Sequence, residues 1–211
     1  MQINKNGWVQ LPKKLLDDMD WHENDNLLFR QEKEGVFLHK EEKNAGNALF
    51  VRCFEHFHIE YAGEEIPVKK KLREMLAYLI TYNNELINKW TVAQQLWPDS
   101  SKTQAMDCLY KVLRCFVKSE NLIEKIPLEI YREQLRIRLS VREIDFLLFE
   151  QFALSKDPSL WLEALKLYQG GFLETECYEW SIQQQMKYEI KFEILQKNLK
   201  KFDDISGKFS I

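Results

Sequence analysis

The stretch that decides the fold runs from Trp90 to Ser119 and reads WTVAQQLWPDSSKTQAMDCLYKVLRCFVKS. Its first part, 92–97, predicts a short apolar helix that stops at Pro98, because proline has no N–H to donate and disfavours a helical residue before it. Ser100 or Ser101 can then accept a hydrogen bond from a free N–H at the start of a new helix. The stretch therefore predicts two helices joined by a tight turn.

The second of these helices, 102–118, has two different faces. Its apolar residues recur at helical spacing, which predicts that one face is buried: Ala105, Cys108, Leu109, Val112, Leu113 and Phe116. Its polar residues would form the open face: Lys102, Gln104, Asp107, Lys111, Arg114 and Lys118. A cationic open face after a tight turn is typical of the recognition helix of a helix-turn-helix protein. A core helix with a solvated charged face fits the same pattern, and the spacing leaves both interpretations open.

The distribution of charge favours the first interpretation. The whole chain of 211 residues has a formal net charge of −3, which is no signature of nucleic-acid binding. Residues 69–142, however, carry 14 basic and 8 acidic side chains, a net charge of +6, and they contain the candidate recognition helix. Attraction to DNA phosphates needs a locally basic surface and not a basic protein.

Other classes of protein have little support in the sequence. The four cysteines form no C-x-x-C pair and are expected to be small buried residues in a reducing compartment. The absence of a signal peptide and of an apolar run near 18 residues predicts a cytoplasmic protein without a membrane span. No phosphate-binding glycine loop or nucleophile elbow is present, and no further ligands flank His56 and His58. We therefore expect no enzyme activity, no cofactor and no metal site.

The segments on either side of the central stretch complete one domain. Strands are expected at 49–54 and 56–61, then a turn at 62–65 and a short strand at 66–68. A helix is expected at 69–82, and its first turn is basic: Lys69, Lys70, Lys71 and Arg73. After the recognition helix, strands at 122–126 and 134–139, joined by a loop at 127–133, form a predicted hairpin.

This order of elements resembles the winged helix of OmpR/PhoB-type proteins, and more specifically that of the SARP/AfsR-type transcription regulators. The matching residues are KLREMLAYLI at 71–80, LWP at 96–98 and Leu113-Arg114. The resemblance implies that residues 48–142 form a winged-helix DNA-binding domain, with helix 102–118 in the major groove and the hairpin at 122–139 as a wing at the neighbouring minor groove. The chain has Glu133-Gln134-Leu135 where the family's wing carries Gly-Tyr.

The resemblance also implies which side chains contact double-stranded DNA. Those expected on the recognition helix are Lys102, Thr103, Gln104, Asp107, Lys111, Arg114 and Lys118. Phosphate contacts are expected from Lys71 and Arg73 at the start of helix 69–82 and from Arg132 in the wing. Arginine and lysine can neutralise phosphates or bind guanine edges, and glutamine can bind adenine through two hydrogen bonds.

Residues 1–43 form a separate segment. Strands are expected at 7–12, 27–31 and 35–39, with a helical turn or two at 13–19. The segment resembles the swapped-hairpin domain of AbrB, SpoVT and MazE proteins, through Gly7, Val9, Leu11, Pro12, Leu15, Glu23, Asp25 and Leu27. The resemblance implies a homodimer with interleaved strands. Since Trp8 and Asp17 replace basic residues of the family, dimerisation without DNA contact, dimerisation with DNA contact and a monomeric cap all stay open.

Residues 143–211 are predicted to be helical. Helices are expected at 144–153, 160–168 and 178–202, the last amphipathic with apolar positions at Ile182, Met186, Ile190, Phe192, Leu195 and Leu199. The stretch resembles the start of the bacterial transcriptional activation domain of SARP-type regulators, through LYQGGFL at 167–173, Glu179-Trp180 and Lys187-Tyr188. This implies a shortened array of tetratricopeptide-like hairpins, which we expect to pack on the winged helix or on a second subunit.

Taken as a whole, the sequence predicts a multidomain α+β protein: a swapped-hairpin domain at 1–43, a winged helix at 48–142 and a helical region at 143–211. The expected function is sequence-specific DNA-binding transcription regulation by a homodimer, with RNA polymerase or another regulator as a further partner. The alternative is a protein-interaction module, antitoxin-like or regulatory, that has lost specific DNA binding.

Overall fold

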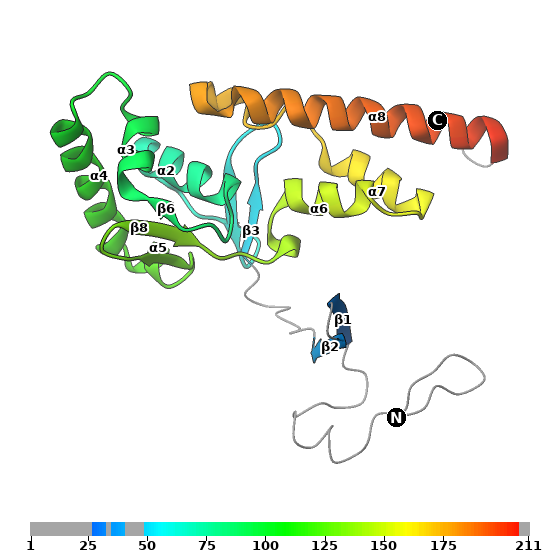
Figure 1. The fold of residues 1–211 in the computed structure, drawn as a ribbon, viewed down its shortest axis with the longest axis horizontal. Helices are drawn as coiled ribbons and strands as arrows, with labels where there is room; N and C mark the ends of the chain where they lie inside the picture. Colours follow the sequence, from blue (N-terminus) through cyan, green and yellow to red (C-terminus); the bar gives the residue numbers. More distant parts are fainter. Residues whose placement is uncertain (1–26, 33–34, 41–48, 207–211) are drawn as a thin grey trace, which may run out of the picture. The chain divides into compact units, whose positions relative to one another are not determined.

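The computed structural model describes residues 27–32, 35–40 and 49–206, and the chain divides into two compact units, Met1–Ala45 and Gly46–Ile211. The predicted strand at 7–12 and the helical turns at 13–19 lie outside the described residues. The larger unit contains both the predicted winged helix and the predicted helical region (Figure 1). No helix in the described part of the chain is long and apolar enough to cross a membrane.

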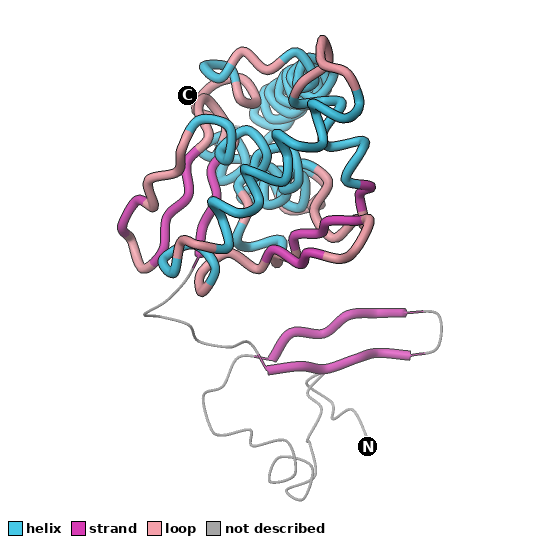
Figure 2. Tube along the Cα trace, turned by 90° about the vertical axis from the view of Figure 1, so that its left-hand side faces the viewer, coloured by secondary structure: helices cyan, strands magenta, loops and turns pink. Residues whose placement is uncertain are grey.

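The described residues of the smaller unit form an antiparallel hairpin. Strand β1 (Leu27–Glu32) pairs with β2 (Gly35–Lys40), from Leu27 opposite Lys40 to Glu32 opposite Gly35. The two strands run side by side along their full length (Figure 2). Both predicted strands are confirmed, each one residue longer than expected. A two-stranded ribbon is marginally stable by itself, so this hairpin needs a further packing surface.

The larger unit begins with a three-stranded antiparallel sheet of β3 (Leu49–Arg52), β4 (His58–Tyr61) and β5 (Glu64–Glu65), in that order. The prediction of a turn at 62–65 and a strand at 66–68 was wrong by two residues. Ala62 and Gly63 both have positive φ, so they reverse the chain at once and bring Glu64 opposite Tyr61. Pro67 has no N–H with which to extend a strand.

Three helices and a second sheet follow. The helices are α2 (Lys70–Thr81), α3 (Lys89–Leu96) and α4 (Lys102–Val117). The second sheet has the order β6-β8-β7 and consists of β6 (Ile87–Asn88), β7 (Leu128–Ile130) and β8 (Gln134–Ile137). The helices gather between the two sheets (Figure 2), and a continuous core joins them, in which Met75, Leu76, Leu79, Leu109 and Leu135 are fully buried.

The predicted hairpin at 122–139 has a different first strand. Residues 122–126, predicted to be a strand, belong to helix α5 (Glu120–Ile123) and the turn that follows it. Leu122 and Ile126 are buried while Ile123 is 46% exposed, so the buried positions are four residues apart, as in a helix. The first strand is β7, inside the predicted loop at 127–133. It places Leu128 opposite Ile137.

The helical region consists of α6 (Asp145–Ala153), α7 (Pro158–Leu167) and the long α8 (Ile182–Ser206). Short 3-10 turns at Val141–Glu143, Glu174–Glu176 and Glu179–Ser181 connect these elements. Helix α8 begins four residues later than predicted, after the last of these turns. Its buried residues are Tyr188, Leu195 and Leu199.

The helical region packs on the winged part of the same chain, which was one of the two packing surfaces expected from the sequence. Asp145 is buried at the start of α6. Its Oδ2 atom accepts from two backbone N–H groups just after β3, those of Cys53 at 2.7 Å and Phe54 at 2.9 Å. Tyr78 of α2 meets Trp180 edge to face at 5.1 Å between ring centroids. Because these contacts are buried, residues 49–206 behave as one structural unit.

Candidate nucleic-acid interface

The turn between α3 and α4 follows the predicted chemistry. Helix α3 ends at Leu96, before Pro98, and the hydroxyl of Ser101 accepts from the backbone N–H of Gln104 at 3.4 Å. The Gln104 side-chain oxygen accepts from the backbone N–H of Ser101 at 3.3 Å. This reciprocal capping box begins α4 and confirms Ser101, and not Ser100, as its cap.

Helix α4 buries most of the predicted apolar face: Ala105, Leu109, Leu113 and Phe116 are at most 5% exposed, while Cys108 and Val112 are partly buried. Six of the predicted DNA-contacting residues are exposed and fall within about 100° of arc on the opposite face: Thr103, Gln104, Asp107, Lys111, Arg114 and Lys118. Lys102 is exposed at the start of the helix, and its Nζ lies 5.3 Å from the centre of the Trp90 ring. The structure therefore brings six of the seven predicted residues onto one surface.

The cations on this surface have no acidic partner among the residues that the structure describes. Within the described residues, no carboxylate pairs with Lys111, Arg114 or Lys118. Other cations of the same unit are paired, including Arg136 with Glu129 at 2.6 Å. Three unpaired cations along one helix give a surface that attracts an anionic partner.

The wing is the β7–β8 hairpin with its turn at 131–133. The Glu129 carboxylate accepts from Tyr131 Oη at 2.6 Å and Arg136 Nε at 2.7 Å, and it lies 3.1 Å from Arg138 Nε. These contacts lower the pKa of Glu129 and raise that of Arg136. The Arg132 side chain lies 3.7 Å from the exposed Glu133 carboxylate and is itself 96% exposed, so it is the arginine of this hairpin best placed to reach a phosphate.

The two residues predicted at the start of α2 lie in different surroundings. Lys71 Nζ is 2.8 Å from Glu74 Oε2, donates to the Leu96 carbonyl at 2.9 Å and remains 45% exposed. The Arg73 guanidinium donates to the Phe57 carbonyl and pairs with Glu176 Oε1 at 2.6 Å. Arg73 therefore holds the helical region and does not face the exposed side of α4.

Replacing Arg73 by methionine is expected to lower the free energy of unfolding by about 2–4 kcal/mol. The substitution keeps the packing stem but leaves the largely buried Glu176 carboxylate without its cation. Urea denaturation of R73M measures this loss, and adding Glu176→Gln should recover part of it. An unchanged urea midpoint together with weaker DNA binding would instead place Arg73 at the DNA, as the sequence predicted.

Two residues of this region were not singled out from the sequence. A depression of about 290 Å³ lies between α4 and the wing and is lined by Lys89, Tyr110, Leu113, Arg114, Val117, Lys118 and Ile130. Tyr110 is 41% exposed in it, whereas Lys89 is only 6% exposed. The sequence pattern could not mark Lys89, because an isolated lysine before an apolar helix is normally solvated.

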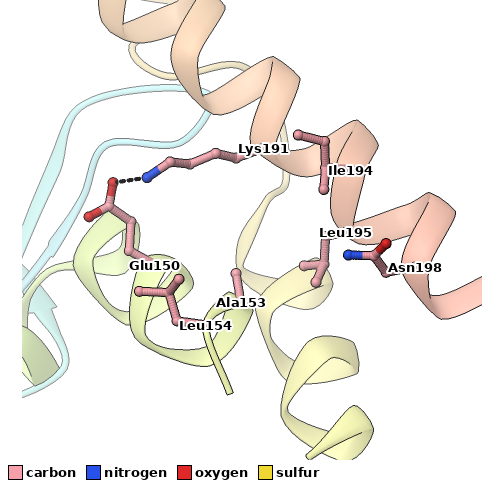
Figure 3. A pocket seen from close by; sticks show the side chains of 7 residues that line it. All are labelled: Glu150, Ala153, Leu154, Lys191, Ile194, Leu195 and Asn198. Carbon is pink, nitrogen blue, oxygen red and sulfur yellow. Dashed lines mark hydrogen bonds and ion pairs between the residues drawn. The ribbon is translucent and has the colours of Figure 1, made fainter. Parts of the chain in front are cut away.

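A second surface lies on the helical region. Ile182, Met186, Ile190 and Ile194 form an exposed apolar stripe on α8, each between 52% and 58% exposed. Next to it, α6 and α8 enclose a pocket of about 150 Å³ (Figure 3). Leu154, which is 86% exposed, lines this pocket beside Ala153 and Leu195, and Lys191 spans it to Glu150 at 2.5 Å.

Comparisons with known proteins give a structural likeness to a solved protein. No protein-family model matches the chain, and no curated protein sequence matches it. The structure is similar to that of Mycobacterium tuberculosis EmbR, solved in complex with a low-affinity phosphopeptide, with a TM-score of 0.63 and 13% sequence identity. The similarity covers 77% of this chain and 47% of EmbR, so this chain matches about half the length of that protein. The fold of this chain is therefore a mixed α+β fold similar to that of EmbR.

Proposed function

We propose that this chain is a sequence-specific DNA-binding transcription regulator. In this proposal, α4 enters the major groove and the β7–β8 wing contacts the neighbouring minor groove. The observation that carries it is the exposed face of α4, where Lys111, Arg114 and Lys118 have no acidic partner among the described residues. The EmbR-like fold supports the same class of protein, because EmbR is a SARP-type regulator.

The side chains of α4 divide into two roles. Lys111, Arg114 and Lys118 neutralise phosphates or bind guanine edges, and Asp107 accepts from a cytosine amino group. Gln104 binds adenine only after it gives up its hydrogen bond in the capping box, which makes that contact dependent on the start of the helix. Arg132 supplies the wing contact, and Lys71 and Lys102 supply further positive charge.

Dimerisation through residues 1–43 is part of the proposal. Two copies would each present one α4, and a two-fold dimer favours inverted half-sites. The paired strands β1 and β2 support this segment as a hairpin that needs a partner surface.

Fluorescence anisotropy with genomic fragments, including the protein's own upstream region, tests the function. If Lys111, Arg114, Lys118 and Arg132 each neutralise one phosphate, the slope of log K against log salt is about −3.6, and binding is about 150-fold weaker at 200 mM than at 50 mM salt. The control is a random-sequence duplex of equal length. Equal affinity for both duplexes at 50 mM salt would refute sequence-specific recognition.

The second candidate function is a protein-interaction module. The exposed stripe of Ile182, Met186, Ile190 and Ile194 favours it, because an apolar surface rimmed by charge is typical of a partner-binding site. RNA polymerase or another regulator would be the partner. A pull-down becomes the deciding experiment if no fragment is bound above the random control.

A further inference from the structure

Lys89 is a buried cation at a junction of three elements. It is the first residue of α3, and it is the one basic side chain among the described residues that is less than 9% exposed. Within the described part of the chain no carboxylate pairs with it. Burying a lysine without a carboxylate is costly, so its remaining contacts must offset that cost.

Those contacts join the wing to the rest of the domain. The backbone N–H of Lys89 donates to the Glu133 carbonyl at 2.8 Å, and its Nζ donates to the Arg132 carbonyl at 3.1 Å. One residue therefore engages two consecutive carbonyls of the wing turn. The same Nζ lies 5.6 Å from the centre of the Tyr110 ring, on α4. A cation over an aromatic ring is attracted to the negative face of that ring.

The surrounding sheet explains why this position matters. Immediately before Lys89, β6 pairs with β8 from Ile87 opposite Leu135 to Asn88 opposite Gln134. Strand pairing ends there, and the turn beyond it is open to solvent on the Arg132 side. The two hydrogen bonds from Lys89 therefore attach the wing turn to the start of α3, beyond the last residue pair of β6 and β8.

We propose that Lys89 is a positioning residue that fixes the wing turn at a set distance from α4, so that helix and wing can bind DNA together. This inference rests on the proposed function. Lys89 acts through the main chain of the turn and need not touch DNA. The groups that DNA meets are the Arg132 side chain on the wing and Arg114 and Lys118 on α4.

The test compares three variants of the full chain. Lys89→Met removes the cation and keeps the stem, Lys89→Arg keeps a cation and a donor, and Arg132→Ala removes the wing cation while leaving the turn carbonyls in place. Hydrogen exchange of the wing amides, among them Tyr131 N–H, which donates to Gln134, reports wing attachment without any DNA. Anisotropy against salt reports DNA binding.

For K89M we expect faster exchange at 129–134, unchanged exchange in α2 and α6, and about tenfold weaker DNA binding with a salt slope smaller by about 1. K89R should restore both measurements. R132A should show the same decrease of about 1 in the salt slope, with unchanged hydrogen exchange in the wing. Unchanged wing exchange in K89M would overturn the inference, and so would faster exchange with unchanged DNA affinity.

If the wild-type chain binds no DNA, the proposed function fails, while faster wing exchange in K89M would still show the attachment.

Discussion

Reversing two charges on the exposed face of α4, in the double variant K111E/R114E, is expected to weaken DNA binding by about 100- to 1000-fold. Each contact of a cation with a phosphate or a guanine edge contributes about 1–3 kcal/mol, and the new carboxylates repel the phosphates they replace. The salt slope should also decrease, by about 2, because two fewer phosphates are neutralised. Anisotropy at three or more salt concentrations measures both changes.

The matched control for this variant is K156E/K200E. Both lysines are exposed and lie in the helical region, and the double reversal changes the net charge by the same amount, from −3 to −7. The control should keep nearly wild-type affinity at moderate salt, because charges beyond a Debye length are screened. An equal loss in both variants would mean that only overall charge matters. Undiminished specific binding by K111E/R114E would rule out α4 as the DNA-reading helix.

The second large effect is expected from Asp145→Asn, which should lower the free energy of unfolding by about 3 kcal/mol. Asp145 is 3% exposed, and its two oxygens accept three backbone N–H groups: Cys53 at 2.7 Å, Phe54 at 2.9 Å and Phe146 at 2.7 Å. Asparagine has one accepting oxygen, so its NH₂ group would face at least one N–H donor and leave it unsatisfied in the core. Urea denaturation measures the loss.

The pH dependence of this loss has a defined sign. Burial raises the pKa of Asp145 from 3.8 to about 6, although its three N–H donors act in the opposite direction. Between pH 3.8 and about 6 the folded chain therefore binds more protons at this site than the unfolded chain. Its contribution to stability is present in full below pH 3.8 and is lost as the pH rises through 6, by about 3 kcal/mol in total.

The wild type and D145N should consequently differ more in stability at pH 4.5 than at pH 7.5, since asparagine does not titrate. Because the wild type and D145N share all their other titratable groups, the difference between their unfolding free energies reports the titration of Asp145 alone. Asp145→Ala serves as a second variant, because it leaves all three N–H groups without an acceptor at every pH. A difference that is the same at both pH values would show that Asp145 keeps an ordinary pKa in the folded chain.

Local patterns predicted the central stretch well. The stop at Pro98, a serine cap at Ser100 or Ser101 and the buried face at Leu109 and Leu113 depend on neighbours within one or two turns, which the sequence contains directly. The serine cap and the helical spacing therefore predicted the start and the orientation of α4. The first wing strand was predicted wrongly because Leu122 and Ile126 fit both a strand and a helical turn in a run this short.

Long-range pairings could not be predicted in the same way. Arg73 was expected at DNA as part of a basic first turn, yet it lies against Glu176, which is 103 residues away along the chain. Lys89 had no distinguishing neighbour in the sequence, and its role comes from Arg132 and Tyr110, which only the folded chain brings next to it. A side chain's partner depends on which segments meet, and spacing along the chain does not contain that information.

The amino-acid sequence alone was enough for the order of the main helices, for the two faces of α4 and for a mixed α+β class, because caps, turns and periodicity act over a few residues. The tertiary structure alone decided that the helical region joins the winged part in one unit, which cations remain unpaired, and where the wing stands relative to α4. These features depend on burial and on hydrogen bonds between distant segments. The buried Asp145, which joins α6 to β3, shows the difference, since nothing in its local sequence separates it from a solvated aspartate.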